Sequence, residues 1–185
     1  MTITKLSLLR ICGLICLFCI ILIHQAQALR IVDWYKDVSV GQWIELESND
    51  GLITKTKVIQ KHDGLITLHI ISSLDGENVS DSEQVVDINQ GKVISIKMHT
   101  KTGDIEIDPS ESDFDEVFRL NFEPYHEEEI IVNKGTYMCQ VYRTIYDDRI
   151  VRIWVNQGIP VLHMVQLRMQ SAWIKLRDFG TDGDL

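Results

Sequence analysis

After residue 28 the chain contains a single alanine, Ala172, against 15 valines, 19 isoleucines and 8 threonines among 157 residues. Alanine and leucine favour helices, whereas β-branched side chains fit the pleated surface of a strand. Turn pairs that end in glycine recur about 10–15 residues apart for much of the chain: Asp50-Gly51, Asp63-Gly64, Asp75-Gly76, Gln90-Gly91, Thr102-Gly103, Lys134-Gly135 and Gln157-Gly158. Such regular turns are typical of strands joined by hairpins. The chain is therefore predicted to be an all-β protein.

Apolar and polar residues alternate along most of the runs, which places successive side chains on opposite faces of a strand. The expected strands are 42–48, 52–61, 64–73, 83–88, 92–99, 104–108, 128–133, 136–146, 149–156, 160–170 and 172–179. The predicted architecture is an antiparallel curved sheet or incomplete barrel of about ten strands. In the segment 109–122, Phe114, Val117 and Phe118 have helical spacing, so at most one short helix is expected near 110–120.

The alternation also assigns side chains to an apolar face. The expected sets are Ile66, Leu68 and Ile70; Ile94, Ile96 and Met98; Tyr137, Cys139, Val141 and Ile145; Val151, Ile153 and Val155; Val161, Val165, Leu167 and Met169; Ile174 and Leu176. Arg143 falls on the same face as Cys139, where a buried guanidinium needs an anionic partner.

The N-terminal segment has a different composition. Lys5 and Arg10 precede an uncharged apolar run over 11–23, and Ala26-Gln27-Ala28 fits the rule for signal-peptide cleavage. The run is shorter than the roughly 20 residues that a helix needs to span a bilayer. We expect residues 1–28 to be a signal peptide cleaved after Ala28, and 29–185 to be one β domain, exported to the periplasm or secreted. The alternative is an uncleaved membrane anchor.

The formal net charge of the chain is −9, and without residues 1–28 it is −11. Nucleic acids and anionic membrane surfaces attract proteins with a positive footprint. The overall charge therefore argues against nucleic acid as a partner and against an anionic membrane surface as the main partner. Association with the cell envelope remains open.

Three of the four cysteines lie within residues 1–28, so the exported chain keeps only Cys139 and forms no internal disulfide. A cysteine nucleophile needs a lowered pKa and a partner base. Cys139 instead lies in the middle of an expected strand, between Tyr137 and Val141 on the apolar face. We expect it to be a small core residue.

The sequence contains no recognisable catalytic or cofactor motif. The histidines after residue 28 lack the spacing of metal ligands, and neither a nucleophile elbow nor a phosphate-binding glycine loop is found. The acid-rich run from Asp104 to Glu116 has Pro109 where a calcium loop needs glycine, so it is interpreted as a solvated acidic face, with a weak cation site as the alternative. No metal site and no cofactor are expected, and an enzyme is not favoured. The alternative is a secreted hydrolase whose acids converge only in the fold.

The candidate ligand-binding residues are aromatic and cationic. Trp34, Trp43, Trp154 and Trp173 are large enough to line an apolar cavity, or alternatively to fill the core and the rim of the sheet. Arg143 can reach the rim of the barrel, pair with an acid there or anchor a ligand. The residues selected as ligand-binding are Trp43, Arg143, Trp154 and Trp173.

Two patches, about 50 residues in all, carry a resemblance. Their segments are Val40-Gly41-Gln42-Trp43-Ile44, then Gly135-Thr136-Tyr137-Met138-Cys139, Ile153-Trp154, Ile159-Pro160-Val161 and Leu176-Arg177-Asp178-Phe179-Gly180. They resemble uncharacterised exported bacterial proteins with an opening Gly-x-Trp-Val, then Gly-Thr-Phe-x-Cys, a Trp strand, Val-Pro-Val and Leu-x-Asp-x-Gly. Tyr137 replaces the usual Phe, and Asn156 stands where such proteins tend to have Ser near the Trp. The resemblance implies export in a bacterium and no activity. More loosely, the layout is similar to the periplasmic half-barrels that carry lipoproteins or lipids, a likeness of fold alone.

Together these features predict an exported, non-catalytic binding module whose concave face holds an apolar small molecule, a lipid-like group or a protein segment. The alternatives are the hydrolase and a purely structural cell-envelope protein. A measurable cavity on the concave face would favour the binding module, because a filled core leaves no room for a ligand.

Overall fold

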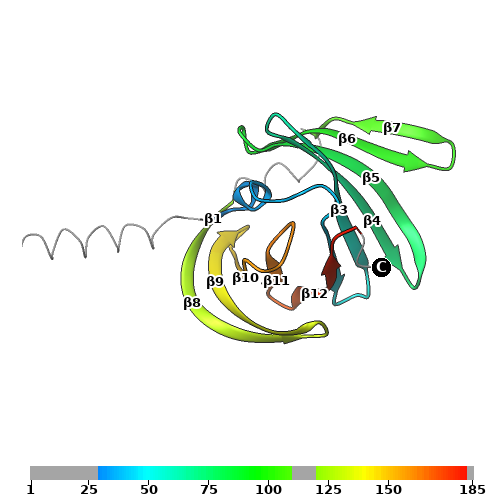
Figure 1. Ribbon diagram of the computed structural model, residues 1–185. Coiled ribbons are helices and arrows are strands. Elements are labelled where there is room, and N and C mark those ends of the chain that lie inside the picture. Colours follow the sequence, from blue (N-terminus) through cyan, green and yellow to red (C-terminus); the bar gives the residue numbers. More distant parts are fainter. Residues whose placement is uncertain (1–28, 110–119, 183–185) are drawn as a thin grey trace, which may run out of the picture.

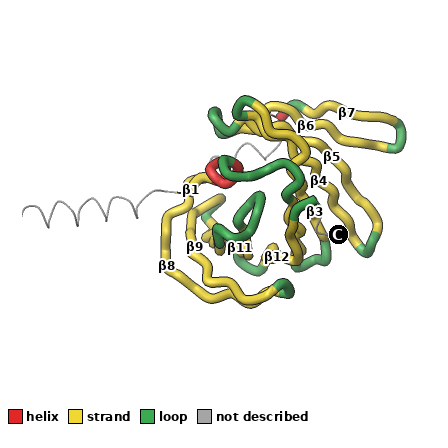
Figure 2. The backbone as a smooth tube through the Cα atoms, viewed as in Figure 1, coloured by secondary structure: helices red, strands yellow, loops and turns green. Residues whose placement is uncertain are grey.

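The computed structural model describes residues 29–109 and 120–182. Its elements are β1 (Leu29–Arg30), the 3-10 helix η1 (Ile31–Tyr35), β2 (Trp43–Ser48), β3 (Ile53–His62), β4 (Leu65–Leu74), β5 (Glu77–Asp87), β6 (Lys92–Thr100), β7 (Gly103–Ile107), β8 (Asn121–Val132), β9 (Gly135–Tyr146), β10 (Arg149–Val155), β11 (Met164–Met169) and β12 (Ala172–Gly180). Strands and loops therefore make up nearly all of the described chain (Figure 2).

All twelve strands belong to one antiparallel sheet with the order β1-β8-β9-β10-β11-β12-β2-β3-β4-β5-β6-β7. The sheet curls strongly but does not close, so that β8 and β9 lie on one side of the molecule and β3 to β7 on the other (Figure 1). The predicted all-β, curved antiparallel architecture is confirmed. Among the described residues η1 is the one helix with a full range, and Pro109 also has 3-10 conformation; the helix predicted near 110–120 falls largely outside the described residues.

Two meanders, β2–β7 and β8–β12, are joined by the pairing of β2 with β12. The tight turns follow the expected chemistry: Asp63 and Gly64, with φ of 49° and 80°, connect β3 to β4, and Asp75 and Gly76 repeat this geometry between β4 and β5. Positive φ at both central residues defines the hairpin turn whose twist matches the strands.

The prediction that Ile94 shares a face with Ile96 is wrong. Val85 pairs with Ser95 and Val86 with Val93, so Ile94 is an extra residue in β6. Such a bulge breaks the alternation of faces, and Ile94 is 41% exposed whereas Ile96 is buried.

The strand predicted over 160–170 begins only at Met164. Pro160 is followed by Val161 and His163, which have φ of 66° and 50°. These left-handed conformations cannot continue a ladder, and they turn the chain between β10 and β11. At two other places the strands exceed the prediction: β5 begins at Glu77 and β8 at Asn121.

The core lies on both faces of β10. Trp154 pairs with Val141 and Ile153 with Tyr142, so the side chains of Trp154 and Ile153 point to opposite faces. Both are buried, with Ile153 fully enclosed. The core does not extend to the C-terminal end of β9. Ile145, predicted to face the core, is 70% exposed.

Candidate binding pocket

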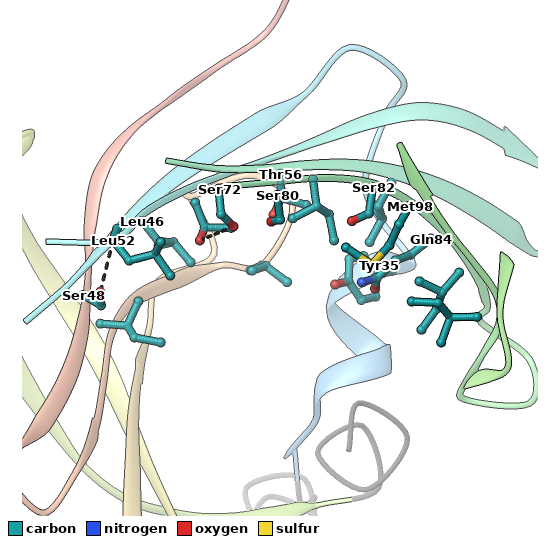
Figure 3. Close-up of a pocket in the computed structure, with 17 residues that line it drawn as sticks. Tyr35, Leu46, Ser48, Leu52, Thr56, Ser72, Ser80, Ser82, Gln84 and Met98 are labelled. Carbon is teal, nitrogen blue, oxygen red and sulfur yellow. Dashed lines mark hydrogen bonds between the residues drawn. The ribbon is translucent and has the colours of Figure 1, made fainter. Parts of the chain in front are cut away.

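A pocket of about 460 Å³ lies on one face of the sheet, called here the pocket face. The lining side chains come from η1, from β2 to β7, from β12 and from two connecting segments: Tyr35, Leu46, Ser48, Leu52, Thr54, Thr56, Leu68, Ile70, Ser72, Ser80, Ser82, Gln84, Ile96, Met98, Ile107, Leu162 and Ile174. Figure 3 shows these side chains projecting from the strands, with Tyr35 pointing towards them from η1. The volume falls within the roughly 300–1,000 Å³ of small-molecule sites.

Hydroxyl groups form a row across three neighbouring strands in this pocket. Thr54 pairs with Ser72, and Ser72 with Ser80, so the three side chains lie next to one another on the pocket face. The hydroxyls of Thr54 and Ser72 are 3.1 Å apart and hydrogen-bonded. Two more hydroxyls, of Thr56 and Ser82, lie two residues along the strands, with the side chains buried. Together the row offers donors and acceptors without a formal charge.

The remaining wall of the pocket is apolar. Leu68, Ile96 and Ile107 follow one another across β4, β6 and β7 through the register partner Gln84 of β5. Leu162 reaches the pocket from the turn between β10 and β11. The pocket thus combines a row of neutral polar groups with an apolar wall, which suits a molecule of mixed polarity.

None of the lining residues that the structure describes is an acid, a lysine, an arginine or a histidine. The one titratable group is the phenol of Tyr35, and burial raises its pKa, so that it stays neutral at physiological pH. A paired-carboxylate mechanism needs two acids about the reacting bond, and a serine nucleophile needs a neighbouring base. The described lining residues supply neither.

The four predicted ligand-binding residues lie on the opposite face of the sheet. Trp43 and Leu46 are three residues apart in β2, so their side chains point to opposite faces of the sheet, as do those of the adjacent Trp173 and Ile174 in β12. Leu46 and Ile174 line the pocket. Arg143 and Trp154 share the face of Trp173 through the registers of β9 to β12. None of the four lines the pocket, and a ligand-binding role for them stays a prediction.

Each of these side chains has a contact of its own. Lys55 lies 4.1 Å over the ring of Trp43, and Lys175 lies 4.9 Å over that of Trp173. The indole of Trp154 is buried and donates a hydrogen bond of 2.9 Å to Glu128. The fourth tryptophan, Trp34, is buried in the core.

Arg143 is not buried on the apolar face, and of the alternatives predicted for it the position at the rim agrees with the structure. Its side chain is exposed and stacks over Tyr125, with 4.9 Å from the guanidinium carbon to the ring centre. The physical reason is that this end of β9 lies beyond the core, as the exposure of Ile145 also shows.

Cys139 is fully buried, which confirms the core prediction. Its thiol donates to the carbonyl of Tyr137 at 3.5 Å. Burial, helped by the negative charge of Glu128, raises the pKa of the thiol to about 11. A nucleophilic cysteine needs the opposite shift.

A cluster of histidines and acids lies on the face of β4–β7 opposite to the pocket. His69 is 2.8 Å from Asp81, and His99 is 2.9 Å from Asp104 and 3.8 Å from Glu83. These side chains are between 31% and 47% exposed. Within the described residues no group of three such side chains has the geometry of a metal site.

The hydrogen bond to Asp104 raises the pKa of His99, and the hydrogen bonds from Lys97 and His99 lower the pKa of Asp104. Because the folded-state pKa of His99 is raised, its pairing stabilises the fold below the ordinary histidine value and the contribution is lost as the pH rises through the folded value. We expect Asp104→Asn to lower the pKa of His99 in an NMR titration. The loss of thermal stability in this variant should be larger at pH 5.5 than at pH 8.5, where only the pair with Lys97 is removed. A pH-independent loss would contradict the assignment.

The sequence interpretation missed the hydroxyl row. A signal was present: Thr54 and Thr56, then Ser80, Ser82 and Gln84, recur at every second position. Alternating small polar residues are typical of the wet face of a strand, so nothing in one strand distinguishes a polar pocket from solvent.

No family model and no curated protein matches the chain. Its fold is similar to a solved structure, at 2.0 Å resolution, of the hypothetical protein CT021 from Chlamydia trachomatis. The TM-score is 0.63 at 7% sequence identity, over 83% of this chain and 93% of that one. At this identity the likeness concerns the fold alone. The described residues include no helix that is long and apolar enough to cross a membrane.

Proposed function

We propose that the protein is an exported, non-catalytic bacterial binding module that holds an uncharged amphiphile in the pocket. The occupant is a lipid-like molecule with an apolar chain and a neutral polar group, such as an ester, amide or hydroxyl. The observation that carries the proposal is a pocket of about 460 Å³ whose described lining contains a hydroxyl row and no ionised side chain.

The distribution of polar groups supports this occupant. An apolar chain placed against Leu68, Ile96 and Ile107 removes hydrocarbon surface from water, at about 25 cal/mol per Å². A neutral polar group can exchange hydrogen bonds with Thr54, Ser72 or Ser80. An ionised carboxylate or phosphate would lose its hydration without meeting a cation, which is costly in a partly buried site.

Export is supported by the N-terminal segment, with its cations, short apolar run and small-x-small site ending at Ala28. A pocket whose described lining carries no charge is consistent with a lipid-like rather than a phosphorylated molecule.

The proposal is tested with a neutral fluorescent probe, N-phenyl-1-naphthylamine, displaced by monooleoylglycerol. Ser72 lies on the pocket face, whereas Ser95 is exposed on the opposite face of β6. We expect Ser72→Phe to weaken binding of monooleoylglycerol at least tenfold, since the ring occupies the pocket, and Ser95→Phe to leave it unchanged. Oleate, with the same chain, should bind at least tenfold more weakly at pH 8.

If Ser72→Phe and Ser95→Phe bind monooleoylglycerol with equal affinity, the ligand lies outside the pocket and the proposal is overturned. Equal affinity for oleate would overturn the neutral head group. Release of oleate from monooleoylglycerol would identify a hydrolase instead.

A further inference from the structure

Three arginines lie side by side on the neighbouring strands β9, β10 and β11. Arg152 of β10 pairs with Arg143 of β9 on one side and with Arg168 of β11 on the other. We call these three residues the arginine row. All three are exposed, and none makes an ion pair with an acid among the described residues.

The fold does not need this arrangement. Directly opposed residues of an antiparallel pair have Cβ atoms about 5 Å apart, and like charges in such positions destabilise the sheet. The row also stands out against the chain, which has a formal net charge of −9. Among the described residues one acid, Glu123, faces a member of the row, Arg143, whereas Arg152 faces only arginines. Two repulsive pairs against one facing acid indicate that further compensating charge comes from outside the protein.

The neighbours of the arginine row are apolar and aromatic. Ile145 and Ile150, which pair with each other two residues along β9 and β10, are 70% and 54% exposed. Tyr125, 51% exposed, stacks with Arg143 at one end of the row. Trp173 pairs with Arg168 at the other end, and Lys175 lies 4.9 Å over its ring. Cations, aromatic rings and protruding aliphatic side chains are the combination found where proteins contact membrane interfaces.

The acids on this face lie on the flanking strands and turns, except that the carboxylate of Glu128 in β8 accepts a hydrogen bond of 2.9 Å from Trp154 of β10. Glu123 pairs with Arg143 at the edge strand β8, and Glu47 pairs with Lys175 on the far side. Asp147 and Asp148 occupy the turn after β9, where Asp147 is 3.9 Å from Arg149. Across β10 and β11 the face therefore stays cationic, while Glu123 and Glu128 of β8 lie on the side of Arg143.

We propose that the arginine row is a docking surface for an anionic phospholipid membrane. The guanidinium groups pair with headgroup phosphates, which they can bind in a bidentate manner. Ile145 and Ile150 enter the boundary between headgroups and acyl chains. The acidic average of the chain opposes binding in any other orientation, so this face alone approaches the bilayer. On β12 the pocket residue Ile174 lies between Trp173 and Lys175, so the row and the pocket occupy opposite faces of the sheet.

The test is co-sedimentation of the full chain with vesicles of phosphatidylglycerol or of phosphatidylcholine, every variant carrying the same N-terminus. We expect preferential binding to phosphatidylglycerol that weakens with added salt. Each cation near the surface contributes about fivefold, so the combined variant Arg143→Gln, Arg152→Gln, Arg168→Gln should lose about a hundredfold in partitioning. The matched control, Lys36→Gln, Lys92→Gln, Lys101→Gln, changes the net charge equally and should lose far less.

Two further variants make the test specific. Ile145→Ser with Ile150→Ser should weaken binding to the same vesicles several-fold without changing its salt dependence. Ser72→Phe, which fills the pocket, should leave vesicle binding intact. Failure of the pocket proposal can therefore be distinguished from failure of the membrane proposal. Arg152→Gln is expected to raise the midpoint of thermal unfolding, because it relieves both repulsive pairs.

Equal partitioning of the arginine and lysine variants would overturn the proposal. Displacement from the vesicles by millimolar inorganic phosphate at constant ionic strength would also overturn it, by identifying a free anion as the ligand. A lowered unfolding midpoint in Arg152→Gln would assign the row a structural role instead.

Discussion

Replacing Ile153 with alanine is expected to lower the free energy of unfolding by about 2–5 kcal/mol. Ile153 has no exposed surface and lies in β10, whose neighbours Val151 and Val155 are also buried. The strand is held between β9 and β11 and has core residues on both faces, so the surroundings cannot collapse into the space left by the lost methyl groups. The cost therefore includes the cavity as well as the lost transfer free energy.

The matched control is Ile131→Ala. Ile131 is also in a strand, β8, but is 75% exposed, so its replacement should change stability by less than about 0.5 kcal/mol. Urea unfolding followed by tryptophan fluorescence measures both variants on the same scale. Similar losses for the two would show that β10 is not the centre of the core.

The strands were predictable because a single property, the alternation of apolar and polar residues, is local. Ile66 and Leu68 are buried as the alternation requires, and Leu176 is likewise buried between two polar neighbours. The turns were equally local, since Asp63-Gly64 needs only its own φ angles.

Features that depend on a partner strand were not predictable. The bulge at Ile94 exists only relative to β5, and one extra residue reverses the face of a side chain. Arg143 shares the face of Val141, as the alternation predicts, but the core ends between these two residues. The sequence of one strand does not show how far its neighbouring strands extend. The sheet order has the same dependence: β2 pairs with β12 across most of the chain length.

The pocket and the arginine row illustrate the same limit. The hydroxyls of Thr54, Ser72 and Ser80 come from three hairpin-connected strands. They form a row only because the register of these strands aligns them. Arg143 and Arg152 are likewise ordinary solvent-facing residues until the register places them together. Trp43 and Trp173 were selected in the sequence because they are large. Their positions along β2 and β12 place them on the face opposite to the pocket residues Leu46 and Ile174.

Because the described lining of the pocket carries no charge, we expect the variant Gln84→Glu to lose much of its stability at neutral pH. Gln84 is 4% exposed and lines the pocket without any cation among the other lining residues. Glutamate has nearly the same shape, so the substitution adds a carboxyl group and little else. Because burial disfavours the charged form, the pKa of the new carboxyl should rise well above the ordinary value of about 4.3 in the folded protein.

The sign of the pH dependence follows. Below about pH 4 the carboxyl is neutral in both the folded and the unfolded chain, and the variant should be close to the wild type in stability. Above that pH only the unfolded chain ionises freely, so the variant loses about 1.4 kcal/mol per pH unit until the folded pKa is reached. With a folded pKa two units above the ordinary value, the loss at pH 7 is about 3 kcal/mol.

Urea unfolding at pH 4, 5.5 and 7 checks this expectation, with Gln60→Glu as the control at an exposed position of β3. The control should show no such dependence, because its carboxyl stays hydrated in both states. A Gln84→Glu variant as stable as the wild type at pH 7 would mean that the pocket admits enough water to solvate an anion. The selectivity against oleate would then have no physical basis, and the preference for a neutral head group would fall with it.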